Sequence, residues 1–173
     1  RWLTLAWLLH GEIRQGFDAL EPRLRGVLIA GAAQLLLLDR VPAHAVINHG
    51  VEWAKQVVRP GAGGLVNAVL RKTAQLRESA TVEPRPWADE PDGIPLASGA
   101  CLRFPRPVLP DDPAERLAIA TSCPRPLVDH WTRSVGRDTA RARALHGLVE
   151  PPVILNIQHA DPALVAGPPP PPP

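Results

Sequence analysis

Residues 24–38 read LRGVLIAGAAQLLLL and carry the clearest structural signal in this chain of 173 residues. Their apolar side chains recur at the i, i+3, i+4 and i+7 spacing of an α-helix that is buried along one face. Additional leucine and isoleucine residues widen that face, and the small residues 31–33 (GAA) let a neighbouring backbone approach closely. We therefore expect a central helix that other helices surround.

Helical spacing continues on both sides of this segment. Residues 2–10 (WLTLAWLLH) predict a helix before it. Pro42 suits the first turn of a second helix, because its missing N–H would be unpaired there in any case. Pro60 and Gly61 end that helix, and another follows the glycine pair at 63–64. The first 79 residues therefore predict a helical bundle.

The second part of the chain has a different composition. Of the 22 prolines, 19 follow residue 80, and the net charge changes from +4 in residues 1–80 to −2 in residues 81–173. We expect residues 80–110 to be a proline-rich linker with a short hairpin around Ser98-Gly99. We expect residues 111–158 to form a small helical connector that ends in a strand at 153–157. We expect residues 159–173 to be a disordered, proline-rich tail. The predicted fold class is mainly α.

Composition excludes several classes of protein. No apolar run reaches the roughly 18 residues that a transmembrane helix needs, so we expect no membrane partner. The two cysteines, Cys101 and Cys123, are too few for a disulfide-stapled scaffold or a four-cysteine zinc site. No G-x-G-x-x-G motif occurs, and the glycine-rich loop at 61–64 lacks the ending of a P-loop, which favours a helix–helix connector. We therefore predict no cofactor site in this chain.

Isolated reactive side chains are also poor candidates for catalysis. His44 and His49 are five residues apart and do not share a helix face, which argues against a common metal ion. Cys123 stands just before an expected helix start at Pro124, where its pKa could be lowered, but no base accompanies it. An inert thiol is the favoured interpretation, and we predict neither a catalytic residue nor a metal ligand.

Basic side chains of the helical part are the candidate binding residues. Two interpretations stay open for them: a solvated surface, or contact with the phosphates of a nucleic acid. The tryptophans are expected to be mostly packed, which leaves few aromatic rings for base stacking. The candidate RNA-binding residues are Arg23, Arg25, Arg40, Lys55, Arg59, Arg71 and Lys72.

Three stretches of the bundle together resemble a known family. They are residues 35–48 (LLLLDRVPAHAVIN), 51–55 (VEWAK) and 64–71 (GLVNAVLR). They are similar to the NusB-type domain that opens the bacterial 16S rRNA cytosine-C5 methyltransferases of the Sun/Fmu (RsmB) kind. Residues 110–122, 124–131 and 151–156 resemble the connector between that domain and the methyltransferase part.

The resemblance implies a fold and a function. It implies an incomplete NusB-like helical bundle in residues 1–79 that lacks its first helices, binds RNA such as small-subunit rRNA, and is cytoplasmic. The chain looks truncated at both ends, with the catalytic domain and its S-adenosylmethionine site outside it, so whether it is an enzyme stays open. Two departures are His49-Gly50, where the family usually has Glu-Ala, and Cys123, where it usually has His.

Three functions remain open on the sequence. The first is the RNA-binding accessory region of an rRNA methyltransferase. The second is a stand-alone NusB-like transcription antitermination factor, and the third is a helical protein-interaction module without nucleic acid. If bundle helices are missing, the apolar face of residues 24–38 stays partly uncovered, and self-association is expected.

Overall fold

A computed structural model describes residues 1–38 and 40–149 of the chain. The expected strand at 153–157 and the proline-rich tail lie outside these residues. In chain order the elements are α1 (Trp2–Glu12), a 3-10 turn η1 (Phe17–Ala19), α2 (Pro22–Leu37), α3 (Ala43–Val57), α4 (Ala62–Glu78), β1 (Thr81–Glu83), β2 (Gly93–Pro95), β3 (Cys101–Arg103), α5 (Pro113–Thr121), α6 (Arg125–Val135) and α7 (Arg137–His146). The prediction of a mainly α fold is confirmed.

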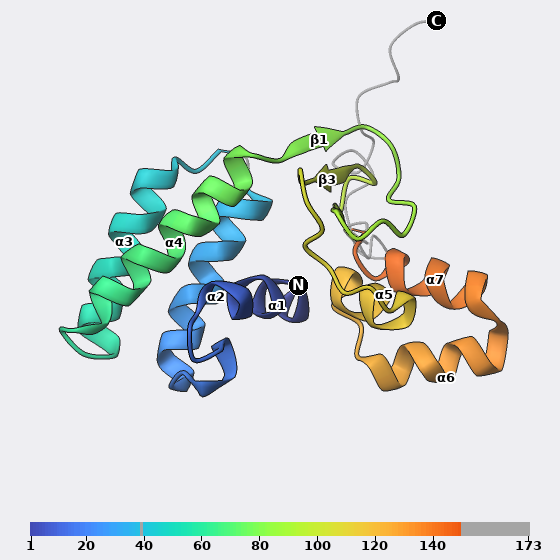
Figure 1. Ribbon diagram of the computed structural model, residues 1–173, viewed down its shortest axis with the longest axis horizontal. Coiled ribbons are helices and arrows are strands. Elements are labelled where there is room, and N and C mark those ends of the chain that lie inside the picture. The colour runs from blue at the N-terminus through green and yellow to red at the C-terminus, as the bar shows by residue number, and fades with distance from the viewer. Residues whose placement is uncertain (39, 150–173) are drawn as a thin grey trace, which may run out of the picture.

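The first four helices form a bundle around α2. Figure 1 shows α2, α3 and α4 side by side, with α1 crossing α2 at its edge and facing α5. The core of this bundle takes side chains from all four helices and from η1; its largest fully buried members are Phe17, Leu9, Leu24, Leu28, Leu70, Val27, Val66 and Val69.

The apolar face of α2 is covered, which corrects one expectation. Leu24, Val27, Leu28 and Leu35 are each at most 6% exposed, because α1, α3 and α4 pack over them. Only Leu38, at the end of this face, is exposed. The predicted self-association through an uncovered helix face therefore has no basis in these residues.

A second hydrophobic core forms where the sequence predicted a linker. The expected hairpin is present, with β2 and β3 antiparallel and Ile94 opposite Leu102. Strand β1 lies in the segment that looked like linker and pairs with β3, so the sheet order is β1-β3-β2. Trp87 from the same segment is 2% exposed and packs in this core with residues of the sheet and of α5, α6 and α7.

The three C-terminal helices begin and end as their capping residues dictate. Asp112 is the N-cap of α5, and its carboxylate accepts a hydrogen bond of 2.7 Å from the Glu115 amide. Pro113 occupies the first turn, and Ser122 ends the helix in the left-handed conformation. Gly136 separates α6 from α7.

Helix α1 joins the two cores. The hydroxyl of Thr4 donates to the carbonyl oxygen of Ile119 at 2.6 Å and lies 2.9 Å from the Ser122 hydroxyl. The Arg1 guanidinium donates to the carbonyl oxygens of Pro95 and Ala120. These hydrogen bonds fix α1 against the end of α5 and against β2, so the bundle and the second core share an interface.

Candidate nucleic-acid interface

The seven predicted basic residues spread over several sides of the bundle. Arg25 is half-buried, and the other six are exposed. They do not form one continuous patch, because α3 and α4 place their basic residues at opposite ends of the bundle. The position of each one decides which can contact a ligand.

One group gathers where α2 begins and α3 ends. The Arg23 guanidinium donates to the carbonyl oxygen of Val57 at 3.2 Å. Arg59 forms an ion pair with Glu21. Lys55 pairs with Glu52 one turn earlier on α3, with 2.6 Å between Nζ and Oε1. Two of these three cations are therefore neutralised locally, which weakens this end as a site for an anion.

Arg25 and Arg40 differ from each other in environment. The Nε atom of Arg25 is buried and has no hydrogen-bond partner among the described residues. Arg40 is exposed in the turn that precedes α3. Arg40 is thus accessible to a ligand, whereas Arg25 is held partly inside the bundle.

Arg71 and Lys72 are neighbours in sequence but point to different sides of α4. The Arg71 Nε atom donates to Asn67 Oδ1 at 3.1 Å, which orients its guanidinium along the helix. Lys72 Nζ lies 3.3 Å from Glu12 Oε2 of α1. Lys72 therefore ties α4 to α1, while Arg71 has no acidic partner in residues 1–38 and 40–149.

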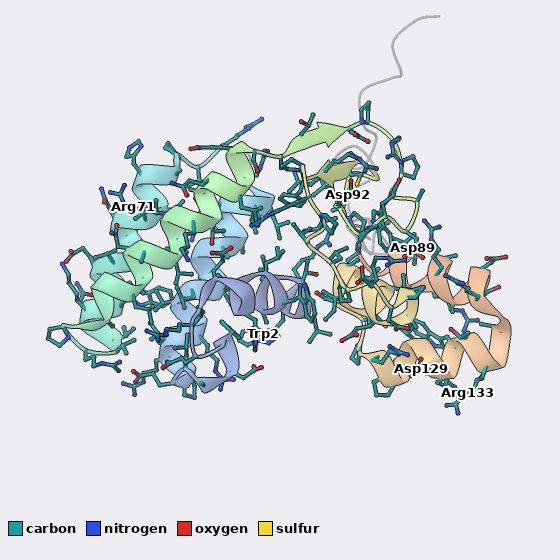
Figure 2. The ribbon with its side chains drawn as sticks, in the orientation of Figure 1. Trp2, Arg71, Asp89, Asp92, Asp129 and Arg133 are labelled. Atoms are coloured by element: carbon teal, nitrogen blue, oxygen red, sulfur yellow. The ribbon has the colours of Figure 1, made fainter. Side chains whose placement is uncertain are left out.

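Arg71 lines a groove between α3 and α4, which we call the α3–α4 groove. It has a volume of about 260 Å³, and its lining residues are Ala43, His44, Ile47, Asn48, Arg71, Ala74, Gln75 and Glu78. Figure 2 shows Arg71 over this helix pair, far along the molecule from the acidic residues Asp89 and Asp92. The groove thus brings one guanidinium without an acidic partner among the described residues together with an imidazole and two side-chain amides.

Sequence periodicity explains the groove and also what was missed. His44 and Asn48 stand one turn apart on α3, and Arg71 and Gln75 stand one turn apart on α4. Each pair is visible in the sequence as a polar stripe, but only the antiparallel packing of the two helices brings the stripes together. Glu78, the one acid that the described part of the chain contributes to the lining, lies two turns from Arg71, roughly 10 Å along the helix axis.

Small residues set the close approach of the three long helices. The side chain of Leu70 packs against Gly31 of α2 and Gly50 of α3, where an added Cβ would lie 2.7 and 3.0 Å from Leu70 Cδ1. Gly50 stands where the resembling family usually has Ala, and here it leaves the space that Leu70 fills. Leu70 directly precedes Arg71, so this packing fixes the position of the turn of α4 that carries the Arg71 side chain.

The remaining candidates show no catalytic arrangement. No group of three or more His, Cys, Asp or Glu side chains within the described residues is placed to hold a metal ion. Burial raises the pKa of both the Cys101 and the Cys123 thiols. The raised pKa of Cys123 is the opposite of the lowered pKa that a helix start at Pro124 could have produced. None of the described helices has the length and apolar character to cross a bilayer.

Comparisons with known proteins agree with the helical bundle. A model of the NusB family matches residues 2–75. The chain is similar to ribosomal RNA small subunit methyltransferase B from three bacteria. The protein of Pseudomonas putida is 38% identical over 73 residues, which is 42% of this chain and 16% of that protein. The protein of Pseudomonas syringae pv. tomato is 35% identical over 84 residues, which is 48% of this chain and 18% of that protein.

The third relative, from Xanthomonas campestris pv. campestris, is 39% identical over 67 residues, which is 39% of this chain and 15% of that protein. The matched part thus spans less than a fifth of the length of these curated relatives. No solved structure matches the chain. The family match covers α1, α2, α3 and most of α4, the helices that build the first core and the α3–α4 groove. The segment from residue 2 to residue 75 is thus similar to the NusB family.

Proposed function

We propose that the NusB-family segment binds RNA with the exposed face of α3 and α4, and that Arg71 makes a central phosphate contact. The observation that carries this proposal is the α3–α4 groove, where Arg71 is free of acidic partners among the described residues and stands beside His44, Asn48 and Gln75. A guanidinium supplies affinity for phosphate, and amide and imidazole groups offer donors and acceptors to base edges.

The proposal ranks the seven predicted residues by their surroundings. Arg71 and Arg40 are exposed and near the groove end of the bundle, so we assign them direct contact with RNA. Arg23 and Arg25 play a lesser part, since one donates to the protein backbone and the other is half-buried. Lys55 serves mainly in an ion pair within α3, and Arg59 and Lys72 serve mainly in ion pairs with residues of other parts of the bundle.

The proposed partner is small-subunit rRNA, and the proposed role is that of an accessory region of an rRNA cytosine-C5 methyltransferase. Support comes from the similarity to methyltransferases that act on small-subunit rRNA by name. In this proposal residues 1–79 bind RNA and residues 111–158 connect them to a methyltransferase domain. That domain, rather than this chain, supplies catalysis and binds S-adenosylmethionine.

A stand-alone antitermination factor is less well supported. The second core is built onto the bundle through Thr4 and Arg1 of α1 and is not a separate appendage. A NusB domain that acts alone has no evident use for this additional sheet and helix trio. The interface therefore favours a chain in which the NusB-family domain is held against a further region.

Binding experiments with matched arginine variants test the proposal. Fluorescence anisotropy would compare a labelled small-subunit rRNA fragment with an unrelated RNA of equal length, across a range of salt concentrations. Arg71→Gln should weaken binding several-fold and lower the steepness of the salt dependence by about one unit, as expected for one lost phosphate contact. Arg133→Gln on α6 removes an exposed arginine outside the NusB-family match and should change little.

Two results would contradict the proposal. If the chain binds no RNA even at low salt, the protein-interaction alternative is favoured. If Arg71→Gln and Arg133→Gln weaken binding equally, the charge of the whole chain rather than the α3–α4 groove accounts for the affinity. Equal affinity for both RNAs would remove the choice of small-subunit rRNA and leave RNA binding itself in place.

A further inference from the structure

A second groove lies where α1 and the end of α4 meet the loop between β3 and α5. It has a volume of about 240 Å³, and its lining residues are Trp7, Leu8, His10, Gly11, Glu12, Leu76, Arg106, Pro107 and Val108. We call it the Trp7 groove. None of these residues belongs to the candidate set that the sequence provided, because the tryptophans looked packed. In the structure Trp7 is 38% exposed, so that expectation is wrong for this ring.

Trp7 is held in a fixed orientation. Its indole Nε1 donates a hydrogen bond of 2.9 Å to the carbonyl oxygen of Val108. The amide of Val108 in turn donates to the carbonyl oxygen of Pro91 at 2.9 Å, which anchors the loop to the second core. The indole N–H is therefore already hydrogen-bonded within the protein. The part of the Trp7 ring that a ligand can contact is its apolar aromatic face.

The charge around this groove is positive. Arg106 is exposed and has no hydrogen bond or ion pair with any residue in the described ranges. Among the described residues, Glu12 is the only acid in the lining, and Lys72 neutralises it across 3.3 Å. An aromatic face beside an unpaired guanidinium suits a ligand that is planar and anionic.

We propose that the Trp7 groove takes one unpaired nucleotide of the bound RNA, with its base stacked on Trp7 and its phosphate against Arg106. The inference rests on the proposed function and specifies which part of the RNA this groove recognises. Pockets for whole small-molecule ligands usually measure about 300–1,000 Å³. The smaller Trp7 groove fits a single base of a polymer whose remaining contacts lie elsewhere.

The Trp7 groove takes its lining residues from both halves of the chain. Trp7 belongs to the NusB-family segment, whereas Arg106 and Val108 lie beyond it. The nucleotide site is therefore complete only when the second core is docked on α1. In this arrangement the NusB-family domain alone binds RNA through α3 and α4, and the docked region adds selection for a single-stranded feature.

A pair of RNAs separates this inference from general RNA binding. One is a hairpin from small-subunit rRNA with an unpaired loop, and the other is a blunt duplex with the same stem sequence. Trp7→Leu should weaken binding of the hairpin about five-fold or more, the lower range for one lost base–aromatic stack, and should leave duplex binding unchanged. Trp7→Phe should retain part of the preference, and Arg106→Gln should lower hairpin affinity without disturbing the indole hydrogen bond.

Matched controls and a spectroscopic signal make the outcome decisive. Trp2→Leu removes another exposed tryptophan of α1, one that lines neither groove and lies outside the proposed RNA-binding face of α3 and α4, and should leave hairpin binding unchanged. Hairpin binding should quench tryptophan emission of the wild-type chain, and Trp7→Leu should lose most of that quenching. Circular dichroism verifies that each variant is folded, and Arg106→Gln provides the test if Trp7→Leu unfolds.

The results distinguish failure of the inference from failure of the proposed function. If the wild-type chain binds RNA, Arg71→Gln weakens it, and the Trp7 and Arg106 variants bind the hairpin like wild type, the nucleotide site is wrong and the RNA-binding proposal stands. If the wild-type chain binds neither RNA, both are wrong. If the Trp7 variants weaken hairpin and duplex equally, the groove does not select an unpaired base.

Discussion

Leu70 of α4 fills the space that a side chain at Gly31 of α2 would need. A Cβ added at Gly31 would lie 2.7 Å from Leu70 Cδ1 and 2.8 Å from Cδ2. The same Cδ1 atom would lie 3.0 Å from a Cβ added at Gly50 of α3. Leu70 is fully buried, so the end of its side chain lies close to the backbones of both α2 and α3.

The first prediction follows from this packing. Gly31→Val should destabilise the chain by about 1–3 kcal/mol, the usual cost of overpacking a core, because the added side chain would clash with the buried end of Leu70. Gly26→Val on the same helix, where nothing lies within 4 Å of an added Cβ, should stay within about 1 kcal/mol of wild type. Urea unfolding followed by circular dichroism measures both.

A double variant identifies the residue responsible for the cost. Adding Leu70→Ala to Gly31→Val should cost less than the sum of the two single changes, because the cavity accepts the new side chain. Strict additivity would show that Gly31 and Leu70 do not compete for the same space.

The second prediction concerns the interface between the two cores. Thr4→Val removes the hydroxyl that donates to the Ile119 carbonyl oxygen and pairs with the Ser122 hydroxyl, so two hydrogen bonds of this buried interface are lost. The expected loss is about 1–3 kcal/mol. Thr73→Val is the matched control, since the Thr73 hydroxyl donates only to the carbonyl of Val69 within α4, and it should cost less than about 1 kcal/mol. Equal losses in the two variants would show that α1 does not depend on α5.

Helix boundaries in the first core were largely predictable from sequence. The segment 24–38 has apolar periodicity, and Pro42 and Pro60 mark the limits of its neighbour, so local rules were sufficient. The second core could not be predicted from the same local rules. Strand β1 and Trp87 sit among prolines that look like a linker, and their partners in β3 and α7 follow later in the chain.

The features of the candidate site also divide into those that the sequence predicts and those that it does not. Arg71 was predicted from its position on a basic helix, and it lies in the groove. The ion pair of Lys72 with Glu12 joins residues 60 positions apart, and no local pattern reveals it. Trp7 belongs to the tryptophans that were expected to be mostly packed. Its exposure depends on how the loop after β3 docks, which only the tertiary structure gives.

The third prediction concerns acid stability. Burial alone would raise the pKa of Glu90, but hydrogen bonds from Arg85 and from the amides of Ala88 and Glu90 outweigh it and lower the pKa from 4.5 to about 2. A depressed pKa means that this carboxylate stabilises the fold above its unfolded-state pKa, and that the contribution disappears as the pH falls from about 4.5 to about 2.

Unfolding as a function of pH tests this directly. The free energy of unfolding of the wild-type chain should fall across that interval, while Glu90→Gln should start lower at neutral pH and show a shallower decline. Arg103, which pairs with Glu90 at 2.9 Å and with Asp92 at 2.6 Å, keeps its charge throughout. If the two pH profiles run parallel, Glu90 does not contribute to acid sensitivity.

The last prediction separates a structured segment from a linker at Trp87. Its ring is buried, its indole Nε1 donates to the Glu90 carbonyl oxygen at 2.9 Å, and the Arg141 guanidinium of α7 stands 5.8 Å from the ring centroid. Trp87→Ala should therefore cost about 3–5 kcal/mol, as for a large core side chain.

Trp53→Ala, at an exposed position of α3, should cost less than about 1 kcal/mol. Differential scanning calorimetry should show a clearly lower Tm for Trp87→Ala only. Because Thr4 and Arg1 bind the end of α5, the weakened second core should also lower the protection of α1 amides in hydrogen exchange. If the Tm falls but the hydrogen-exchange protection of α1 amides is unchanged, the two cores unfold independently. The Trp7 groove, which takes residues from both parts, would then not be stabilised by both cores together.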